Sequence, residues 1–386
     1  MRILFFCRKM PDLCGAFFHD IDLATELQTR GHQVAFLTIL VPAEGYNGGT
    51  YRGFRFMHYT AASGVLESAD ILVTPHSPIL PDVRKINSRG YNRPIVATCH
   101  FDGNYTAVAN SAVARPEWSE MLFFVNTVME ANYRKHILPW PSQIRRTEMV
   151  RPILHRNKVM IEEPFEGDCV TLINANLNKG QVAFLEMAKR MPNQKFLGVL
   201  PYYGEREVAP ATPNVEWIKF DDDIRNIFRR TKILVMPSYY ESFGRVGVEA
   251  MANGIPVLYS KPVKNNQYEN ASTEGLQSWI APAGIACDRD NADEWVSAIQ
   301  SLEDPEVYEE KRKEVKAHID AMKVFDETPR IAGLVESFAR ENPVVVKKTA
   351  QVAQSQQNRP AEAARLMQPV VGQPVGFANG RLRIRR

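Results

Sequence analysis

The sequence predicts an α/β protein built from two Rossmann-like domains, and three observations support this prediction. The chain has 386 residues, which is more than one domain usually holds. Short apolar runs that suit buried parallel strands recur between segments with helical periodicity. The stretch 233–260, ILVMPSYYESFGRVGVEAMANGIPVLYS, joins one such strand to a turn, a helix and a second strand.

Composition and charge narrow the class of protein. Hydrophobic residues make up 45% of the chain and charged residues 24%, which is ordinary for a globular enzyme. The five cysteines are odd in number and none shows CxxC spacing, so we expect neither a disulfide scaffold nor a zinc site. This cysteine usage fits a reducing cytoplasm. No apolar stretch approaches the ~20 residues of a membrane span.

The first domain is expected over residues 1–165. It opens with a strand at Arg2–Phe6, a helix, and a second strand at Val34–Ile39, which is the βαβ order of a Rossmann-like domain. Further strands are expected at Ala69–Thr74, Pro94–Thr98 and Met121–Thr127. Two of these strands are followed closely by a histidine, His76 and His100. Because ligands bind at the carboxyl ends of parallel strands, both histidines are site candidates.

The second domain is expected over residues 166–325, after a linker near 162–168. Its first strand, from Val170, leads into a polar loop that ends in Lys179-Gly180 before a helix. The run Asp221–Asp223 suggests a metal site. These residues directly precede a helix, however, so we expect them to form its N-cap and acidic first turn instead.

A closing helical region at 326–342 and a tail at 343–386 are expected to complete the chain. The tail holds eight Lys or Arg and one acidic residue, whereas the rest of the chain is mildly acidic. The tail is rich in Gln, Pro, Ala and Val, and its sequence shows no helical or strand periodicity, so we expect it to be flexible. Basic arms bind polyanions through phosphate contacts. A solvated tail without a partner and an edge strand packed on the body are the alternatives.

The stretch 233–260 carries the chemistry of the predicted site. The helix that starts at Arg245 directs its N–H groups and positive dipole end toward the loop before it, and Gly244 allows a ligand to approach the backbone. These features suit a phosphate. The carboxylates of Glu241 and Glu249 suit a sugar, because a carboxylate accepts hydrogen bonds from hydroxyls. Together the features predict a nucleotide-sugar site.

The segment E-S-F-G-R-V-G-V-E-A-M-A-N-G-I-P-V resembles the E-x7-E signature of retaining glycosyltransferases with the GT-B fold, the group that includes glycogen and sucrose synthases. The resemblance implies two Rossmann-like domains that face a cleft, with the donor on the second domain and the acceptor on the first. It implies transfer of a sugar from a nucleoside diphosphate sugar with retained anomeric configuration. No metal or other cofactor is expected.

The resemblance also implies roles for individual residues. Glu249 would accept the ribose hydroxyls, and Glu241 would hold the transferred sugar. Lys179 would stabilise the charge on the leaving diphosphate, and His100 would line the sugar. Further donor-binding candidates are Gly15, Asn174, Trp217, Ile218, Phe243, Gly244, Arg245 and Val246. Asn174 stands where the family usually has an arginine, which removes one cation from the diphosphate site.

Two other functions stay open. A GT-B-fold epimerase would convert a nucleotide sugar without an acceptor, and a non-catalytic protein would bind a nucleotide sugar without turnover. The acceptor is open as well: a glycan, a lipid, a protein or a modified DNA base would each fit. The basic tail favours slightly a polyanion over a bilayer, because it lacks the large apolar face of an interfacial helix.

Overall fold

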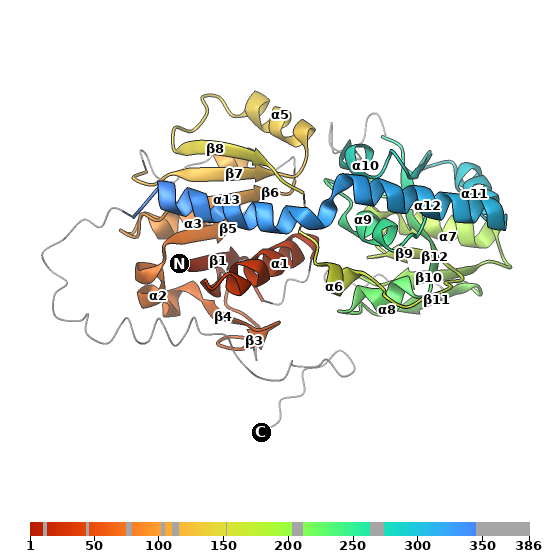
Figure 1. Ribbon diagram of the computed structural model, residues 1–386, viewed down its shortest axis with the longest axis horizontal. Coiled ribbons are helices and arrows are strands. Elements are labelled where there is room, and N and C mark those ends of the chain that lie inside the picture. Colours follow the sequence, from red (N-terminus) through yellow and green to blue (C-terminus); the bar gives the residue numbers. More distant parts are fainter. Residues whose placement is uncertain are drawn as a thin grey trace, which may run out of the picture. The chain divides into compact units, whose positions relative to one another are not determined.

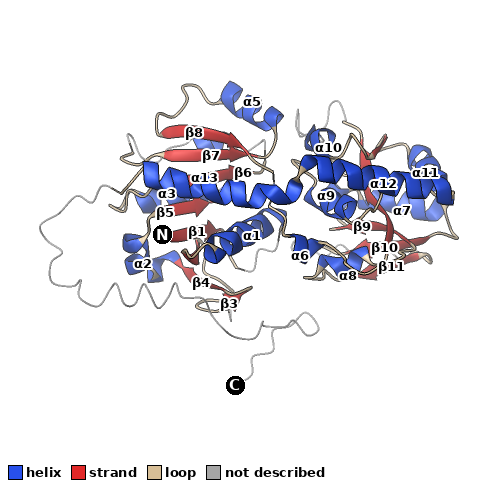
Figure 2. Ribbon diagram, in the orientation of Figure 1, coloured by secondary structure: helices blue, strands red, loops and turns tan. Residues whose placement is uncertain are grey.

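The computed structural model describes residues 1–10, 14–43, 46–74, 79–101, 105–109, 116–151, 153–202, 211–262 and 274–344. These residues form two compact units (Figure 1). Of the described residues, unit 1 holds those within 1–150 and 328–344, and unit 2 holds those within 151–327. Each unit has a mostly parallel sheet with helices packed on it, which confirms the predicted two-domain α/β fold (Figure 2).

The sheet of unit 1 has eight strands in the order β3-β4-β2-β1-β5-β6-β7-β8. All neighbours run parallel except β3 and β4, which pair antiparallel. The strands are β1 (Arg2–Cys7), β2 (Gln33–Thr38), β3 (Thr50–Tyr51), β4 (Phe54–His58), β5 (Ile71–Thr74), β6 (Ile95–Cys99), β7 (Glu120–Phe124) and β8 (Ile144–Met149). Central strands such as β6 are buried along their whole length, which explains their continuous apolar runs.

The helices of unit 1 are α1 (Gly15–Thr29), α2 (Ser63–Ser68), α3 (Leu80–Asn87), α4 (Tyr105–Ala109) and α5 (Thr127–His136), with the short turn η1 (Tyr59–Ala61). The last helix, α13 (Glu327–Glu341), also packs in this unit, as Figure 1 shows. Its Glu336 accepts hydrogen bonds from His32 at 2.8 Å and Arg30 at 3.5 Å, just before β2. The closing helix expected at 326–342 is therefore present and is part of unit 1.

The sheet of unit 2 has six strands in the order β11-β10-β9-β12-β13-β14, and all of them run parallel. They are β9 (Cys169–Ile173), β10 (Lys195–Val199), β11 (Val215–Ile218), β12 (Thr231–Met236), β13 (Val257–Ser260) and β14 (Ile285–Cys287). The helices are α6 (Arg156–Val159), α7 (Gln181–Arg190), α8 (Ile224–Phe228), α9 (Arg245–Ala252), α10 (Glu274–Trp279), α11 (Ala292–Ser301) and α12 (Pro305–Met322), with short turns η4 (Leu177–Lys179) and η5 (Val324–Asp326).

The chain enters unit 2 before the linker that we expected near 162–168. Leu154, Val159 and Ile161 pack in one apolar core with residues of β12, β13 and α9. This packing assigns the segment from Arg151 onward to unit 2.

Successive residues of β12 face opposite sides of the sheet, as strand geometry requires. Leu234 and Met236 belong to the core under α9 and α12, whereas Ile233 and Val235 belong to the core under α7 and α11. The chain thus leaves β9 toward one face and β12 toward the other, although the two strands are neighbours. Such a switch point is where open α/β sheets bind ligands, at the carboxyl ends of the strands.

Candidate functional site

The first loop of the site follows β9 and spans residues 174–180. Asn174 has a φ of 63°, a left-handed conformation that asparagine tolerates better than most residues. The Asn176 side chain caps the turn η4 by accepting the Lys179 N–H at 3.0 Å. Gly180 has a φ of 84°, and a Cβ there would lie 2.0 Å from the Pro237 carbonyl oxygen. Only glycine therefore lets this loop pack against the chain that leaves β12.

The second loop follows β12 and spans residues 237–244. It is joined to the first loop by a hydrogen bond from the Tyr239 N–H to the Asn178 carbonyl, at 2.9 Å. Ser238, which is almost fully buried, donates its hydroxyl to Glu241 Oε1 at 2.9 Å. The loop ends at Gly244, where φ is 79° and a Cβ would lie 2.3 Å from the Leu276 side chain. The two loops are thus bonded to each other at the switch point.

An ion pair joins the two loops. Lys179 Nζ lies 2.5 Å from Glu241 Oε1, and the side chains are 27% and 12% exposed. Both residues were predicted from the sequence as catalytic candidates, Lys179 at the leaving diphosphate and Glu241 at the transferred sugar. The structure brings them into direct contact. A half-buried ammonium at the carboxyl edge of a parallel sheet can bind a phosphate once a ligand enters.

The helix α9 carries the second carboxylate. Glu249 is 7% exposed, and its Oε1 accepts a hydrogen bond from Arg245 Nε at 2.7 Å. The two side chains are one turn apart, at i and i+4, so they lie on the same face of the helix. Gly244 is the N-cap residue of α9, and the first N–H groups of a helix have no intrahelical acceptor. Both glutamates of the predicted motif therefore lie near this edge and each holds a cation.

Other predicted donor-site residues of unit 2 mainly contribute packing through their side chains. Phe243 is buried, and its ring lies 5.7 Å from that of Trp279. The Trp217 ring fills the space beside Gly198, where a Cβ would lie 2.2 Å from it. The Ile218 carbonyl accepts the Leu200 N–H at 2.9 Å. The predicted contacts of Trp217, Ile218 and the half-buried Val246 with a nucleotide concern their backbone, and they stay predictions.

The unit 1 candidates lie at the carboxyl edge of its own sheet. His100 follows β6 and is 8% exposed, and its ring packs edge-on against His19, with the centroids 5.5 Å apart. His19 lies one turn into α1, the helix that Gly15 opens. A Cβ at Gly15 would meet no atom of the described residues within 4 Å. The structure thus brings the start of α1 and the end of β6 together.

One residue at the unit 2 site was not predicted from the sequence. Arg289, in the loop after β14, is 6% exposed and donates from Nε to the Pro237 carbonyl at 3.2 Å. Its guanidinium carbon lies 3.0 Å from the ring centroid of Tyr239. Arg289 thus contacts the same turn, at Pro237 and Tyr239, that carries Glu241. No sequence motif indicates a role for this arginine, because its side chain reaches the site across β13 from a distant loop.

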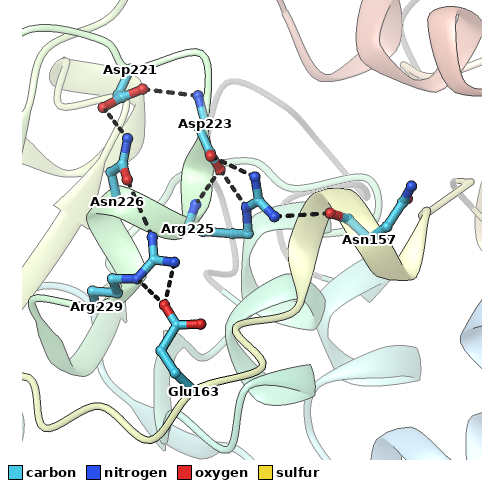
Figure 3. A network of polar contacts seen from close by, with 7 residues as sticks. All are labelled: Asn157, Glu163, Asp221, Asp223, Arg225, Asn226 and Arg229. Atoms are coloured by element: carbon cyan, nitrogen blue, oxygen red, sulfur yellow. Dashed lines mark hydrogen bonds and ion pairs between the residues drawn. The ribbon is translucent and has the colours of Figure 1, made fainter.

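The acidic run before α8 has a structural role. Asp223 is the N-cap residue of the helix, as expected, but the first turn of α8 holds no acidic residue. Asp223 Oδ1 accepts the Arg225 N–H at 3.1 Å, and Asp221 Oδ1 accepts the Asp223 N–H at 2.8 Å (Figure 3). The Arg225 guanidinium, bonded to Asp223, lowers the pKa of that carboxyl below its usual range. Arg225 also donates to the Asn157 carbonyl at 3.0 Å, which attaches α6 to α8. The carboxylates of Asp221 and Asp223 are therefore engaged in capping and in ion pairing.

Two features selected from the sequence lie outside the described residues. His76 is one of them. The basic tail is the other, apart from its first two residues. Within the described parts of the chain, no helix combines the length and the apolar character needed to cross a membrane.

The two parallel-sheet units and the switch-point site in unit 2 define a protein with the GT-B fold. The family model "Glycosyl transferases group 1" matches residues 206–320, which include Glu241 and Glu249. A D-inositol 3-phosphate glycosyltransferase from Corynebacterium kroppenstedtii is 33% identical over 108 residues. That match covers 28% of this chain and 19% of the relative, so the chain aligns with about a fifth of the relative's length.

Solved structures match over most of the chain. A sucrose-phosphate synthase from Thermosynechococcus elongatus has a TM-score of 0.67 at 16% identity, over 88% of this chain and 98% of that one. Anabaena HepE, in a complex with UDP-glucose, also has a TM-score of 0.67, at 17% identity, over 87% of this chain and 100% of that one. These likenesses establish the fold.

Proposed function

We propose that this protein is a retaining glycosyltransferase that moves a sugar from a nucleoside diphosphate sugar to an acceptor not yet identified. The contact between Lys179 and Glu241 is the observation that carries the proposal. It joins the loops after β9 and β12, so a phosphate-binding cation and a hydroxyl-accepting carboxylate lie together at the switch point of the sheet. The segment that resembles the E-x7-E signature lies within the region that the family model covers.

The proposed mechanism assigns charge stabilisation to the protein. As the bond between the anomeric carbon and the diphosphate breaks, negative charge develops on the leaving oxygen. Lys179 and the N-terminal N–H groups of α9 stabilise that charge. The acceptor oxygen attacks the face from which the diphosphate leaves, which retains the configuration, and the leaving group takes up the acceptor's proton. We propose that activity is metal-independent, because Lys179 and the start of α9 supply the positive charge at the leaving diphosphate. No covalent nucleophile is assigned.

The remaining roles in the proposal follow the resemblance. Glu249 accepts the ribose hydroxyls, and Glu241 contacts the transferred sugar. His100, whose ring packs against His19, lines the transferred sugar. Asn174 supplies no charge, so the diphosphate site relies on Lys179 and on the start of α9.

UDP-glucose is the first donor to test, because HepE was solved with that ligand. The full chain is incubated with UDP- and GDP-sugars, and release of the nucleotide and the configuration of any product are followed by NMR. Hydrolysis or transfer with retained configuration is expected. A new nucleotide sugar formed without an acceptor would favour an epimerase, whereas binding without turnover would favour a non-catalytic protein. Absence of binding to every nucleoside diphosphate would refute the proposal.

We propose that the tail contributes to acceptor engagement through a polyanion, with DNA that carries a modified base as one candidate. Its eight basic residues support phosphate contacts, whose affinity falls steeply with salt. Binding of DNA and of anionic vesicles is compared for the full chain and for a chain that lacks residues 343–386, at about 50 and 200 mM salt. Equal binding by both chains at both salt concentrations would exclude this role.

A further inference from the structure

A buried side chain at the start of α7 has an unused hydrogen-bond donor. Gln181, the first residue of this helix, is 4% exposed. Its Nε2 is buried and has no hydrogen-bond partner within the described parts of the chain. An amide nitrogen of this kind can only donate, so what it lacks is an acceptor.

The burial pattern of α7 does not explain why position 181 is a glutamine. Gln181 lies on the same helical face as the buried Phe184 and Ala188, which pack against the sheet. An apolar residue would suit that face, whereas a buried donor without an acceptor destabilises a fold by ~1–3 kcal/mol. Such a group in a native protein calls for an explanation, and a ligand that supplies the acceptor is one.

The position of Gln181 indicates which kind of ligand atom would accept a hydrogen bond from its Nε2. Its backbone N–H donates to the Asn176 carbonyl at 3.1 Å, within the loop that carries Lys179. The preceding Gly180 is in contact with the Pro237 carbonyl at the end of β12. The start of α7 therefore lies in the gap between β9 and β12, at the same edge as the ion pair of Lys179 and Glu241. A phosphate oxygen at this edge offers only lone pairs, which is what a free donor beside an ammonium requires.

We propose that Gln181 Nε2 donates a hydrogen bond to a phosphate oxygen of a nucleoside diphosphate bound at the carboxyl ends of β9 and β12. The assignment rests on the proposed function and adds a neutral donor to the diphosphate site, in a chain that has Asn174 at the family's arginine position. It also explains the cost of the buried amide, because the energy lost in the free protein is recovered when the diphosphate binds.

The test uses Gln181→Met in the full chain, which keeps the length of the side chain and removes the donor. We expect binding of UDP or GDP, whichever the wild type binds, to weaken about 10- to 100-fold by calorimetry. Binding of the matching nucleoside should be unchanged. The unfolding midpoint of the free variant should be equal to or above that of the wild type, because the unsatisfied amide is gone. If Gln181 only stabilised the fold, the unfolding midpoint of the variant would be lower than that of the wild type.

Gln143→Met is the matched control. Gln143 is also buried, at 5% exposure, and its Nε2 likewise has no partner among the described residues, but it lies in unit 1. Its substitution should leave diphosphate binding unchanged. Gln181→Leu is the second variant, in case methionine packs poorly.

Three results would overturn the inference. Both Gln181 variants could bind the diphosphate as tightly as the wild type, both could lose nucleoside and diphosphate binding equally, or both could unfold at a clearly lower temperature. Failure of the wild type to bind any nucleoside diphosphate is a different result, because it would refute the proposed function itself.

Discussion

Replacing Lys179 by alanine tests the centre of the proposed site. The substitution removes the ammonium that lies 2.5 Å from Glu241 Oε1, but the carboxylate keeps the hydroxyl of Ser238 as a donor. Because the lysine is 27% exposed, water can replace part of its contact. A partly exposed ion pair contributes ~1 kcal/mol or less to stability, which in a unit of this size lowers the unfolding midpoint by about 2–4 °C.

The expected effect on turnover is much larger. Loss of one group that stabilises a developing charge costs ~100- to 1000-fold in kcat. Lys179→Ala should therefore lower kcat by at least ~100-fold with a small change in the unfolding midpoint. Thermal unfolding and steady-state release of nucleotide from the donor sugar measure the two effects. Glu241→Gln is the companion variant, since it keeps a hydrogen-bond acceptor for Lys179 and removes the negative charge.

Two outcomes would contradict this reasoning. Turnover within about threefold of the wild type would remove Lys179 from the mechanism. A fall of the unfolding midpoint far beyond a few degrees, with unchanged kcat in the folded fraction, would make the ion pair a structural bond between the two loops.

Four further predictions follow from the structure. Glu249→Ala should weaken nucleotide binding about 10- to 100-fold by calorimetry, because the ribose loses a charged acceptor; unchanged affinity in a folded variant would reject the ribose assignment. Excess EDTA should leave turnover intact, and loss of turnover that magnesium or manganese restores would reject the metal-free proposal. Arg289→Ala should lower turnover. Arg312→Ala, the control, should not: Arg312 lies on α12, and it likewise donates to a carbonyl (Gly254, 3.3 Å) and packs over a tyrosine ring. In the native protein at pH 8 only Cys14 should react with a thiol reagent, because the other cysteines are buried. Burial also raises the pKa of Cys169 to about 11 and that of Cys287 to about 12. Mass spectrometry of the labelled protein checks this.

The segment 233–260 was largely predictable from the sequence because each of its signals is local. A short apolar run, a proline, a glycine before a helix and a glycine after it each act within a few residues. The structure places β12, α9 and β13 where these signals predicted them, with Gly244 and Gly254 both at positive φ. Glu241 and Glu249 could be selected for the same reason, since their spacing along the chain fixes their position on the loop and the helix.

Contacts between distant segments could not be predicted in this way. Arg289 contacts Pro237 and Tyr239 across β13, and nothing in the residues around it indicates that its side chain is buried. Gln181 follows Lys179 directly, but its importance appears only when its amide proves to be buried without an acceptor. The partnership of His19 and His100 likewise depends on how α1 packs beside β6.

The charges at the unit 2 site are already paired in the free protein, and this has a consequence for donor binding. Lys179 holds Glu241, and Arg245 holds Glu249, so neither carboxylate stands as an isolated negative charge against an incoming diphosphate. The proposed function requires an exchange of partners, in which Lys179 contacts a phosphate and Glu241 turns to a sugar hydroxyl while keeping the hydroxyl of Ser238. Each new contact replaces an existing one. Net affinity then depends on groups that give up no partner on binding, and Gln181 is a group of this kind.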